Sequence, residues 1–259
     1  MDLCVHPNVR EINIKKAAQV GVSEAIRNVL GTIAHQDPDP ALLVLPDEQN
    51  GKKIFSKRII PLFEDTPCLA ELKTNSAHDV KLTQILLANG FNLSLGWSGS
   101  PSTLASDPQR FVINDEVDKF AEWRGREADP ISLGEVRTAT YENSLIVNIS
   151  TPTTRLGMIH QLCEQSGVKL SFNVPCPYCG GFQVMKFSQI RWLYHEIEDA
   201  KKRAAKIVGE RAAWYECEHC QSHIQDIDKP AMVRAGYWGD DGEFKLHVRH
   251  TDSESADDL

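Results

Sequence analysis

The segment EINIKKAAQVGVSEAIRNVLGTIA, residues 11–34, passes from an apolar run through a loop of small residues into an amphipathic stretch. A loop of this kind can hold phosphate, because its backbone N–H groups and the N-terminus of the following helix attract an anion. The usual Gly-Lys-Ser/Thr ending is missing, since Val22 stands at the lysine position. Lys16, at the start of the loop, could supply the cation from the opposite side, and Ser23 could bind Mg²⁺. The alternative interpretation is an ordinary strand-to-helix turn with a serine cap.

The same alternation of apolar runs and amphipathic stretches continues to about residue 174. It predicts an α/β fold with a mostly parallel sheet flanked by helices. We expect strands at 11–14, 41–45, 91–95, 111–113, 144–149 and 168–174, and helices at 23–34, 49–63, 131–141 and 154–165. Ligands of such sheets bind outside the carboxyl ends of the strands, so the loops that follow the strands are the expected place for chemistry.

Two later strands also end in residues that suit phosphate chemistry. Asp115 and Glu116 follow an apolar run; the first acid could hold Mg²⁺ and the second could polarise a water that attacks a γ-phosphate. Another apolar run leads into Ser150 and Thr151, whose hydroxyls could sense that phosphate. Taken singly, the acids could be a solvated turn and the hydroxyls ordinary helix caps. The occurrence of all three loops in this order favours the functional interpretation.

Four of the seven cysteines form two Cys-x-x-Cys pairs. The pairs are Cys176 with Cys179 and Cys217 with Cys220. Zinc takes four tetrahedral ligands, and each pair presents two thiolates, so we expect a structural zinc site with no open position for catalysis. A redox-active pair is the rival interpretation, but it needs one reactive pair near a helix N-terminus. His219 and His223 are alternative ligands, although we favour surface histidines.

These patterns divide the chain into three parts. We expect an ATPase-like α/β core at 1–172, a small zinc-ribbon-like module at 173–240 with a charged helix inserted at 196–213, and an acidic disordered tail at 241–259. Basic side chains of the inserted helix could contact a DNA backbone. Acidic neighbours balance them, so a solvated face is the favoured interpretation. The basic residues are Lys201, Lys202, Arg203, Lys206 and Arg211.

Composition excludes several classes of protein. A chain of 259 residues that is 41% hydrophobic can bury a sizeable core. No apolar run approaches the roughly 18 to 20 residues that span a bilayer, and the N-terminus lacks the features of a signal peptide, so we expect a cytosolic protein without a membrane partner. The formal net charge of −8 argues against nucleic acid covering the whole surface, although it is compatible with a local basic face.

Five segments together resemble a known family. They are KKAAQVGVSE at 15–24, GWSGSPSTLASDPQRFVINDEVDKF at 96–120, VNISTPT at 147–153, CPYCG at 176–180, and AWYECEHC at 213–220 with the following DKPAMVRAGYW. The chain resembles the terminase large subunit of lambda-like bacteriophages, the ATPase motor that packages viral DNA into proheads. The resemblance extends from about residue 10 to residue 238. It is specific because the displaced-lysine loop and the cysteine pairs occur together.

The resemblance implies a P-loop NTPase-type sheet that binds ATP with Mg²⁺, followed by a zinc module. Carried over by position, it implies Lys16 as the phosphate-loop lysine, Gly21 as the loop glycine, Ser23 as the Mg²⁺ hydroxyl, Asp115 as the metal-shell acid, Glu116 as the catalytic base, and Ser150 and Thr151 as coupling residues.

Two positions depart from the family. Gln19, within the nucleotide-binding loop, and Ala105 stand where relatives often have arginine. If either arginine stabilises transition-state charge, this chain would hydrolyse ATP slowly or borrow an arginine from a neighbouring subunit. Arg110 and Arg155 are the nearest substitutes in the sequence.

The resemblance also implies partners: double-stranded phage DNA, the terminase small subunit, the portal protein of the prohead, and further copies of the chain when it is active in the host cytoplasm. Relatives continue into a nuclease domain, and nothing after Trp238 could encode one, so we expect no endonuclease activity. The alternative is a catalytically inactive prophage remnant, or an accessory assembly protein, held together by structural zinc.

Overall fold

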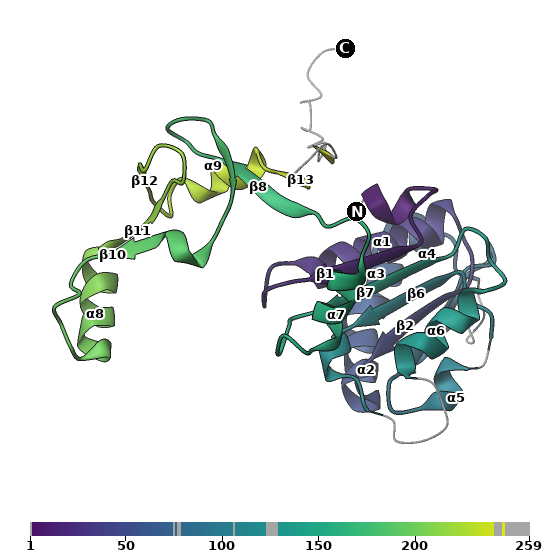
Figure 1. Cartoon of the computed structure of the whole chain (residues 1–259). Coiled ribbons are helices and arrows are strands. Elements are labelled where there is room, and N and C mark those ends of the chain that lie inside the picture. Colours follow the sequence, from purple (N-terminus) through teal and green to yellow (C-terminus); the bar gives the residue numbers. More distant parts are fainter. Residues whose placement is uncertain are drawn as a thin grey trace, which may run out of the picture. The chain divides into compact units, whose positions relative to one another are not determined.

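The computed structural model describes residues 2–74, 76, 79–105, 107–122, 129–240 and 245–246. The chain divides into two compact units, Met1–Ser166 and Gly167–Leu259, and each is described by itself (Figure 1). This division lies six residues before the expected one at 172. In the described ranges, no helix combines the length and apolar character needed to cross a bilayer.

A seven-stranded sheet forms the centre of the first unit. In sheet order its strands are β1 (Glu11–Lys15), β7 (Leu145–Ser150), β6 (Phe111–Asp115), β2 (Ala41–Leu45), β5 (Asn92–Trp97), β4 (Gln84–Leu86) and β3 (Val80–Lys81). The first five run parallel, whereas β4 and β3 pair antiparallel at one edge. The expected α/β fold with a mostly parallel sheet is therefore confirmed. The two edge strands were not expected, because strands of two and three residues are too short to show a period.

Helices flank the sheet. They are η1 (Asp2–Val5), α1 (Val22–Gln36), α2 (Glu48–Ile54), the π-helix η2 (Phe55–Ile59), α3 (Ile60–Asp65), α4 (Pro67–Ala70), α5 (Pro101–Leu104), η3 (Val117–Lys119), α6 (Pro130–Thr138) and α7 (Met158–Gln165). The helix expected at 49–63 is built from α2, η2 and α3 in succession. The helix expected at 154–165 begins only at Met158, because the preceding residues form a loop against η3.

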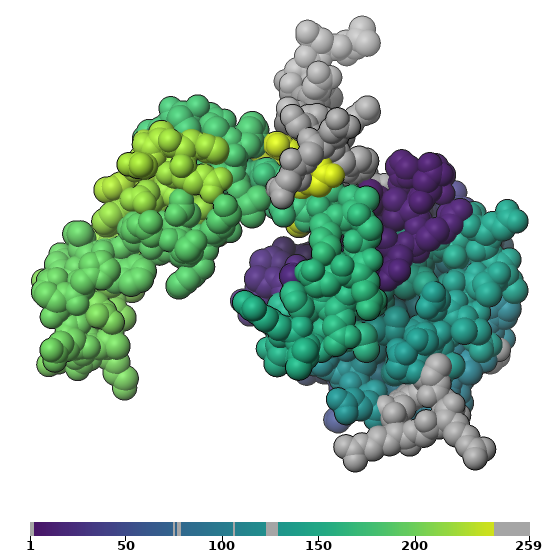
Figure 2. Space-filling model, in the orientation of Figure 1, coloured from purple at the N-terminus to yellow at the C-terminus, as the bar shows by residue number. Residues whose placement is uncertain are grey.

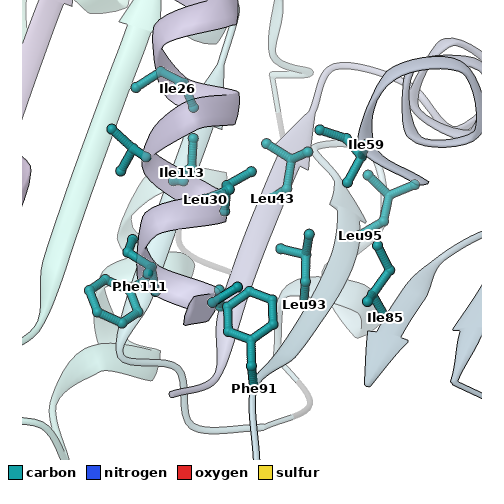
Figure 3. Packing of buried hydrophobic residues seen from close by; sticks show 14 of the residues in the cluster. Ile26, Leu30, Leu43, Ile59, Ile85, Phe91, Leu93, Leu95, Phe111 and Ile113 are labelled. Atoms are coloured by element: carbon teal, nitrogen blue, oxygen red, sulfur yellow. The ribbon is translucent and has the colours of Figure 1, made fainter. Parts of the chain in front are cut away.

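The main core lies between α1 and the sheet. Ile26 and Leu30 of α1 point toward Leu43 and Ile113 of the central strands, and all four side chains are buried (Figure 3). Every residue of β2 is buried, as expected for a strand covered on both faces. This packing holds α1 along one face of the sheet, so that its N-terminus and the loop before it lie at the carboxyl ends of the strands.

A chain of amide hydrogen bonds crosses the three strands β1, β7 and β6. Asn13, Asn148 and Asn114 stand in register on these strands. Asn114 Nδ2 donates to Asn148 Oδ1 at 2.7 Å, and Asn148 Nδ2 donates to Asn13 Oδ1 at 2.9 Å and to Glu11 Oε1 at 3.3 Å. Asn114 and Asn148 are fully buried. A register shift would leave these amides unpaired, so these hydrogen bonds fix the register of the three strands.

The second unit is antiparallel throughout its described sheets. One sheet has the order β14 (Lys245–Leu246), β13 (Tyr237–Gly239), β8 (Ser171–Pro175) and β9 (Phe182–Val184); the other has β10 (Ile190–Trp192), β11 (Ala213–Glu216) and β12 (His223–Ile224). The strand expected at 168–174 thus belongs to this unit as β8, because it pairs with β9 and β13 and not with the parallel sheet. Of the expected tail, 245–246 pair with β13, and the rest lies outside the described residues.

The described part of this unit also contains the short 3₁₀-helix η4 (Phe187–Gln189), α8 (Ala200–Glu210) between β10 and β11, and α9 (Lys229–Arg234). The charged helix expected at 196–213 is α8. At the N-terminus of α8, the Asp199 carboxylate accepts hydrogen bonds from the N–H groups of Lys201 and Lys202. None of its residues is buried, and it is exposed in the space-filling view (Figure 2).

The amide chain predicts a specific loss of stability. Replacing Asn148→Leu should lower the free energy of unfolding by about 2–4 kcal/mol, because it removes the partners of the buried Asn114 Nδ2 and of the partly buried Asn13 Oδ1. Chemical denaturation measures this. Asn28→Leu, on the exposed face of α1, is the matched control and should change stability by less than about 0.5 kcal/mol. Equal effects of the two substitutions would contradict a stabilising role for the amide chain.

Candidate active site

The loop between β1 and α1 has a tight, exposed conformation. Gly21 has φ 82° at the N-cap of α1, and Gln19 has φ 58°. Both lie in the left-handed region, which a side chain at position 21 would adopt only with strain. At the start of the loop, the N–H of Lys16 donates to the Ser150 carbonyl at 3.0 Å. The loop therefore leaves β1 beside the end of β7 and turns sharply into the N-terminus of α1.

Lys16 lies at the centre of the polar contacts at this end of the sheet. Its Nζ atom lies 3.0 Å from Glu116 Oε1 and 3.4 Å from Thr151 Oγ1. The lysine side chain is only 9% exposed. One ammonium group thus contacts residues that follow β6 and β7, 100 and 135 positions further along the chain.

Glu116 is an ionised carboxylate held by two lysines. Its Oε2 atom lies 3.0 Å from Lys119 Nζ, on the side away from Lys16. Burial raises the pKa of the Glu116 carboxyl, but the hydrogen bonds and charges of the two lysines outweigh burial, and the net pKa lies below its usual value. Glu116 also has φ 63°, an uncommon backbone conformation for this residue type that turns the chain out of β6.

Asp115 has the opposite electrostatic character. Burial, and next the charge of Glu116, raise the pKa of its carboxyl above the usual value, although Lys16 opposes them. Its Oδ1 atom is buried and has no hydrogen-bond partner among the described residues. Asp115 and Ser23 both line a cavity of about 60 Å³ between α1 and the sheet. A carboxylate oxygen and a hydroxyl beside one cavity are ligands of the kind that Mg²⁺ prefers.

Ser150 and Thr151 make different contacts with this group of residues. Ser150 is fully buried, and its Oγ atom accepts from the N–H of Asp118 at 3.2 Å. Thr151 contacts Lys16 as described above. Ser150 and Thr151 therefore contact both Lys16 and the turn that follows Asp115 and Glu116.

The structure brings Lys16, Glu116, Ser150 and Thr151 together, and Ser23 and Asp115 line the same cavity. Gln19 and Gly21 shape the loop. The sequence analysis missed two residues of the turn after β6, Lys119 and Asp118. The pattern Asp-Glu-x-Asp-Lys at 115–119 is the only signal that could have found them, since a 3₁₀ turn places residues three apart on one side.

The sequence analysis named Arg110 as a nearby arginine, and this is wrong. Arg110 directly precedes β6, so it lies at the opposite end of this strand from Asp115. Its guanidinium binds Asp37 Oδ2 at 2.5 Å and Asp39 Oδ2 at 2.6 Å. Arg155 lies on the exposed loop between β7 and α7.

The four paired cysteines of the second unit form one cluster. Their Sγ atoms all lie within 4.8 Å of one another, with 3.8 Å between Cys176 and Cys220 and 3.9 Å between Cys179 and Cys217. Four sulfurs at about 2.3 Å from a tetrahedral zinc would be about 3.8 Å apart, so the spacing is compatible with zinc.

The two cysteine turns are built in the same way. The N–H of Tyr178 points at Cys176 Sγ and that of His219 at Cys217 Sγ, at 3.5 and 3.4 Å. Each turn closes with a left-handed residue, Gly180 or Gln221. His219 Nε2 is bonded to the Phe182 carbonyl at 2.9 Å. That contact occupies His219 Nε2, so the cluster that the structure describes consists of the four cysteine sulfurs.

One family model matches most of the chain. Residues 1–238 match the family described as "Phage terminase large subunit gpA, ATPase domain". The terminase large subunit of Enterobacteria phage P21 is 23% identical over 257 residues, 93% of this chain and 38% of that protein. That of Escherichia phage lambda is 23% identical over 250 residues, 90% of this chain and 37% of that protein. The crystal structure of the HK97 bacteriophage large terminase is similar over 62% of this chain and 34% of that chain, with 17% identity and a TM-score of 0.49. The chain thus spans less than two fifths of the length of these two relatives.

The electrostatics of the site predict how stability depends on pH. The pKa of Glu116 is lower in the folded chain than in the unfolded chain, where it is about 4.3. Ionised Glu116 therefore stabilises the fold above that value, and this contribution is lost as pH falls through the lowered pKa. Wild type should exceed Glu116→Gln in stability at pH 7, and the difference should vanish in acid. Denaturation at several pH values measures it, with exposed Glu142→Gln as the control.

Asp115→Asn should show the opposite sign. Because the pKa of Asp115 is raised on folding, its charge destabilises the fold at neutral pH, and the neutral amide should increase stability there but not in acid. The same sign for Glu116→Gln and Asp115→Asn would contradict this assignment of the two acids.

Proposed function

The chain belongs to the family of phage terminase large subunit gpA ATPase domains, and on that premise we propose that it binds ATP with Mg²⁺ and hydrolyses it at the carboxyl ends of β1, β6 and β7. The observation that carries the proposal is the position of the Lys16 ammonium, in contact with both Glu116 and Thr151. In this proposal the first unit is a P-loop NTPase-type domain with a displaced lysine.

The loop before α1 would receive the phosphates. Its backbone amides and the positive end of the α1 dipole favour an anion, and Lys16 adds a full positive charge. Gly21 allows the left-handed turn into the helix, and Gln19 contributes a second left-handed residue in the exposed part of the loop.

Ser23 and Asp115 would hold Mg²⁺. The unpartnered Oδ1 atom of Asp115 and the cavity that it shares with Ser23 support this assignment. When bound, Mg²⁺ neutralises phosphate charge. A nearby cation would also lower the raised pKa of Asp115, so that this carboxylate is ionised when it is needed.

Glu116 would act as the general base. Water attacks the γ-phosphorus, the bond to the β–γ bridging oxygen breaks, and Glu116 accepts the water proton. Its lowered pKa keeps the carboxylate ionised at neutral pH. Lys16, which pairs with Glu116, is then near both the base and the phosphates.

Hydrolysis would be coupled to movement of double-stranded DNA through Ser150 and Thr151, which touch the acid turn and the lysine. The proposed setting is a packaging motor in the bacterial host cytoplasm, with the terminase small subunit, the portal protein and further copies of the chain as partners. Because this chain spans under two fifths of its curated relatives, these activities of the whole protein are part of the proposal. A neighbouring copy could supply the arginine that Arg110 does not.

We assign the four-cysteine cluster to structural zinc in a zinc-ribbon-like module. Cys176 and Cys217 belong to the small core of the second unit, together with Tyr215 and Met232. Since thiolates occupy all four positions of a tetrahedron, the metal would stabilise this core and would not catalyse.

ATP turnover by the purified chain tests the proposed hydrolysis, with and without double-stranded DNA. Lys16→Ala and Glu116→Gln should each lower kcat by about 10²- to 10³-fold, because one removes phosphate charge stabilisation and the other the base.

Lys15→Ala is the matched control for this test, since Lys15 is the neighbouring lysine but faces His160 at 3.3 Å. It should keep turnover within about twofold of wild type. Turnover that survives Lys16→Ala and falls with Lys15→Ala would reassign the lysine. A folded wild type without turnover would instead favour the inactive alternative.

The zinc assignment predicts one tightly bound zinc per chain by elemental analysis. Cys217→Ser should lower zinc content and unfold the second unit, because it removes one of four ligands from a buried position. Cys68→Ser is the control, since Cys68 is exposed and outside the cluster. Retention of full zinc content by Cys217→Ser would contradict the four-thiolate site.

A further inference from the structure

Asp118, which the proposed chemistry does not use, makes the most extensive contacts of any acid at this end of the sheet that the structure describes. Its Oδ2 atom accepts from the N–H and from the Oγ1 of Thr153, at 2.8 and 2.9 Å. Its Oδ1 atom accepts from the N–H of Ile159 at 2.8 Å. These hydrogen bonds outweigh the effect of burial, and the pKa of Asp118 lies below its usual value. One carboxylate thus binds both ends of the loop from Thr153 to Ile159.

The loop is shaped to fit this carboxylate. A Cβ atom at Gly157 would lie 2.2 Å from Asp118 Oδ2, although the φ of Gly157 is −63° and any residue could adopt it. Glycine is therefore required there by the close approach of Asp118 and not by the backbone. Gly157 is also the N-cap of α7 and provides no side-chain cap, so Asp118 supplies negative charge to that helix N-terminus from elsewhere in the chain.

Asp118 also belongs to the same short turn as Glu116. The N–H of Lys119 donates to the Glu116 carbonyl at 2.8 Å, which closes the turn, and the N–H of Asp118 donates to Ser150 Oγ at 3.2 Å. A displacement of Glu116 must therefore move Asp118, and with it the loop and the start of α7. Lys16 contacts both Glu116, in this turn, and Thr151, which follows β7.

We propose that Asp118 is a positioning residue that couples the turn of Glu116 to the loop from Thr153 to Ile159 and thereby to α7. The proposal rests on the function proposed above: a change at the base during hydrolysis is transmitted through the Asp118 carboxylate to α7. Asp118 does not touch the reacting atoms.

Kinetics of Asp118→Asn in the full chain test this role. The amide keeps the shape but loses the charge and one of the two acceptor oxygens. We expect KM for ATP to stay within about twofold, while kcat and its stimulation by DNA fall about 10- to 100-fold, because the loop and base lose their relative position. Gly157→Ala should reproduce this pattern from the other side of the contact.

Asp129→Asn is the matched control. Asp129 caps α6 through the N–H groups of Ile131 and Ser132, at 3.0 and 3.2 Å, so it matches Asp118 as a helix-capping carboxylate. It should lower the melting temperature but leave kcat and the DNA stimulation unchanged. If Asp118→Asn behaves like Asp129→Asn, Asp118 is a helix cap only and the proposal is overturned.

A second measurement does not depend on ATP turnover. Amide hydrogen exchange across 153–165 is compared in wild type, Glu116→Gln, Asp118→Asn and the double variant. We expect Glu116→Gln to accelerate exchange there, and to have no further effect when Asp118 is already Asn, since the path is then broken. Additive effects would overturn the coupling. A wild type that shows this non-additivity but no hydrolysis would contradict the proposed function and leave the coupling established.

Discussion

The relative level of three parallel strands is the constraint on which the candidate site depends. Lys16, Glu116 and Thr151 each follow a different strand, and a shift of one residue would separate their side chains by more than 3 Å. The hydrogen-bonded amides of Asn13, Asn148 and Asn114, of which the last two are buried, oppose such a shift because each would lose its partner. The sheet interior therefore uses polar groups for register, while apolar side chains of α1 and of the strands form the main core.

At the strand ends, neighbouring acids acquire opposite properties from their surroundings. Asp115 is buried and loses solvation, which disfavours its charge, whereas Glu116 faces two lysines, which favour its charge. Two carboxylates in sequence can therefore have a metal-binding and a proton-accepting role without competing. Glu116 adopts its left-handed backbone conformation at this point, directly after the end of β6.

The parallel sheet was predictable because its strands are apolar runs of five or six residues with helices between them. The loops that gather around Lys16 were also predictable in kind, since all follow such strands. The contact of Asp118 with Ile159 was not, because it spans 41 residues and depends on where α7 begins. Nor could β8 be assigned to its sheet from its own residues, since its partners β9 and β13 lie in later, short segments.

Arg110, at the amino end of β6, also restrains the position of α1. It binds Asp37, the C-cap of α1, and thereby attaches the far end of that helix to the start of β6. The helix has 15 residues, a length of about 22 Å. This ion pair opposes sliding of the C-terminal end of α1 along β6. A tilt of about 5° about this end would displace the loop between β1 and α1 by about 2 Å, so a small rotation at one end of the helix gives a larger movement at the other.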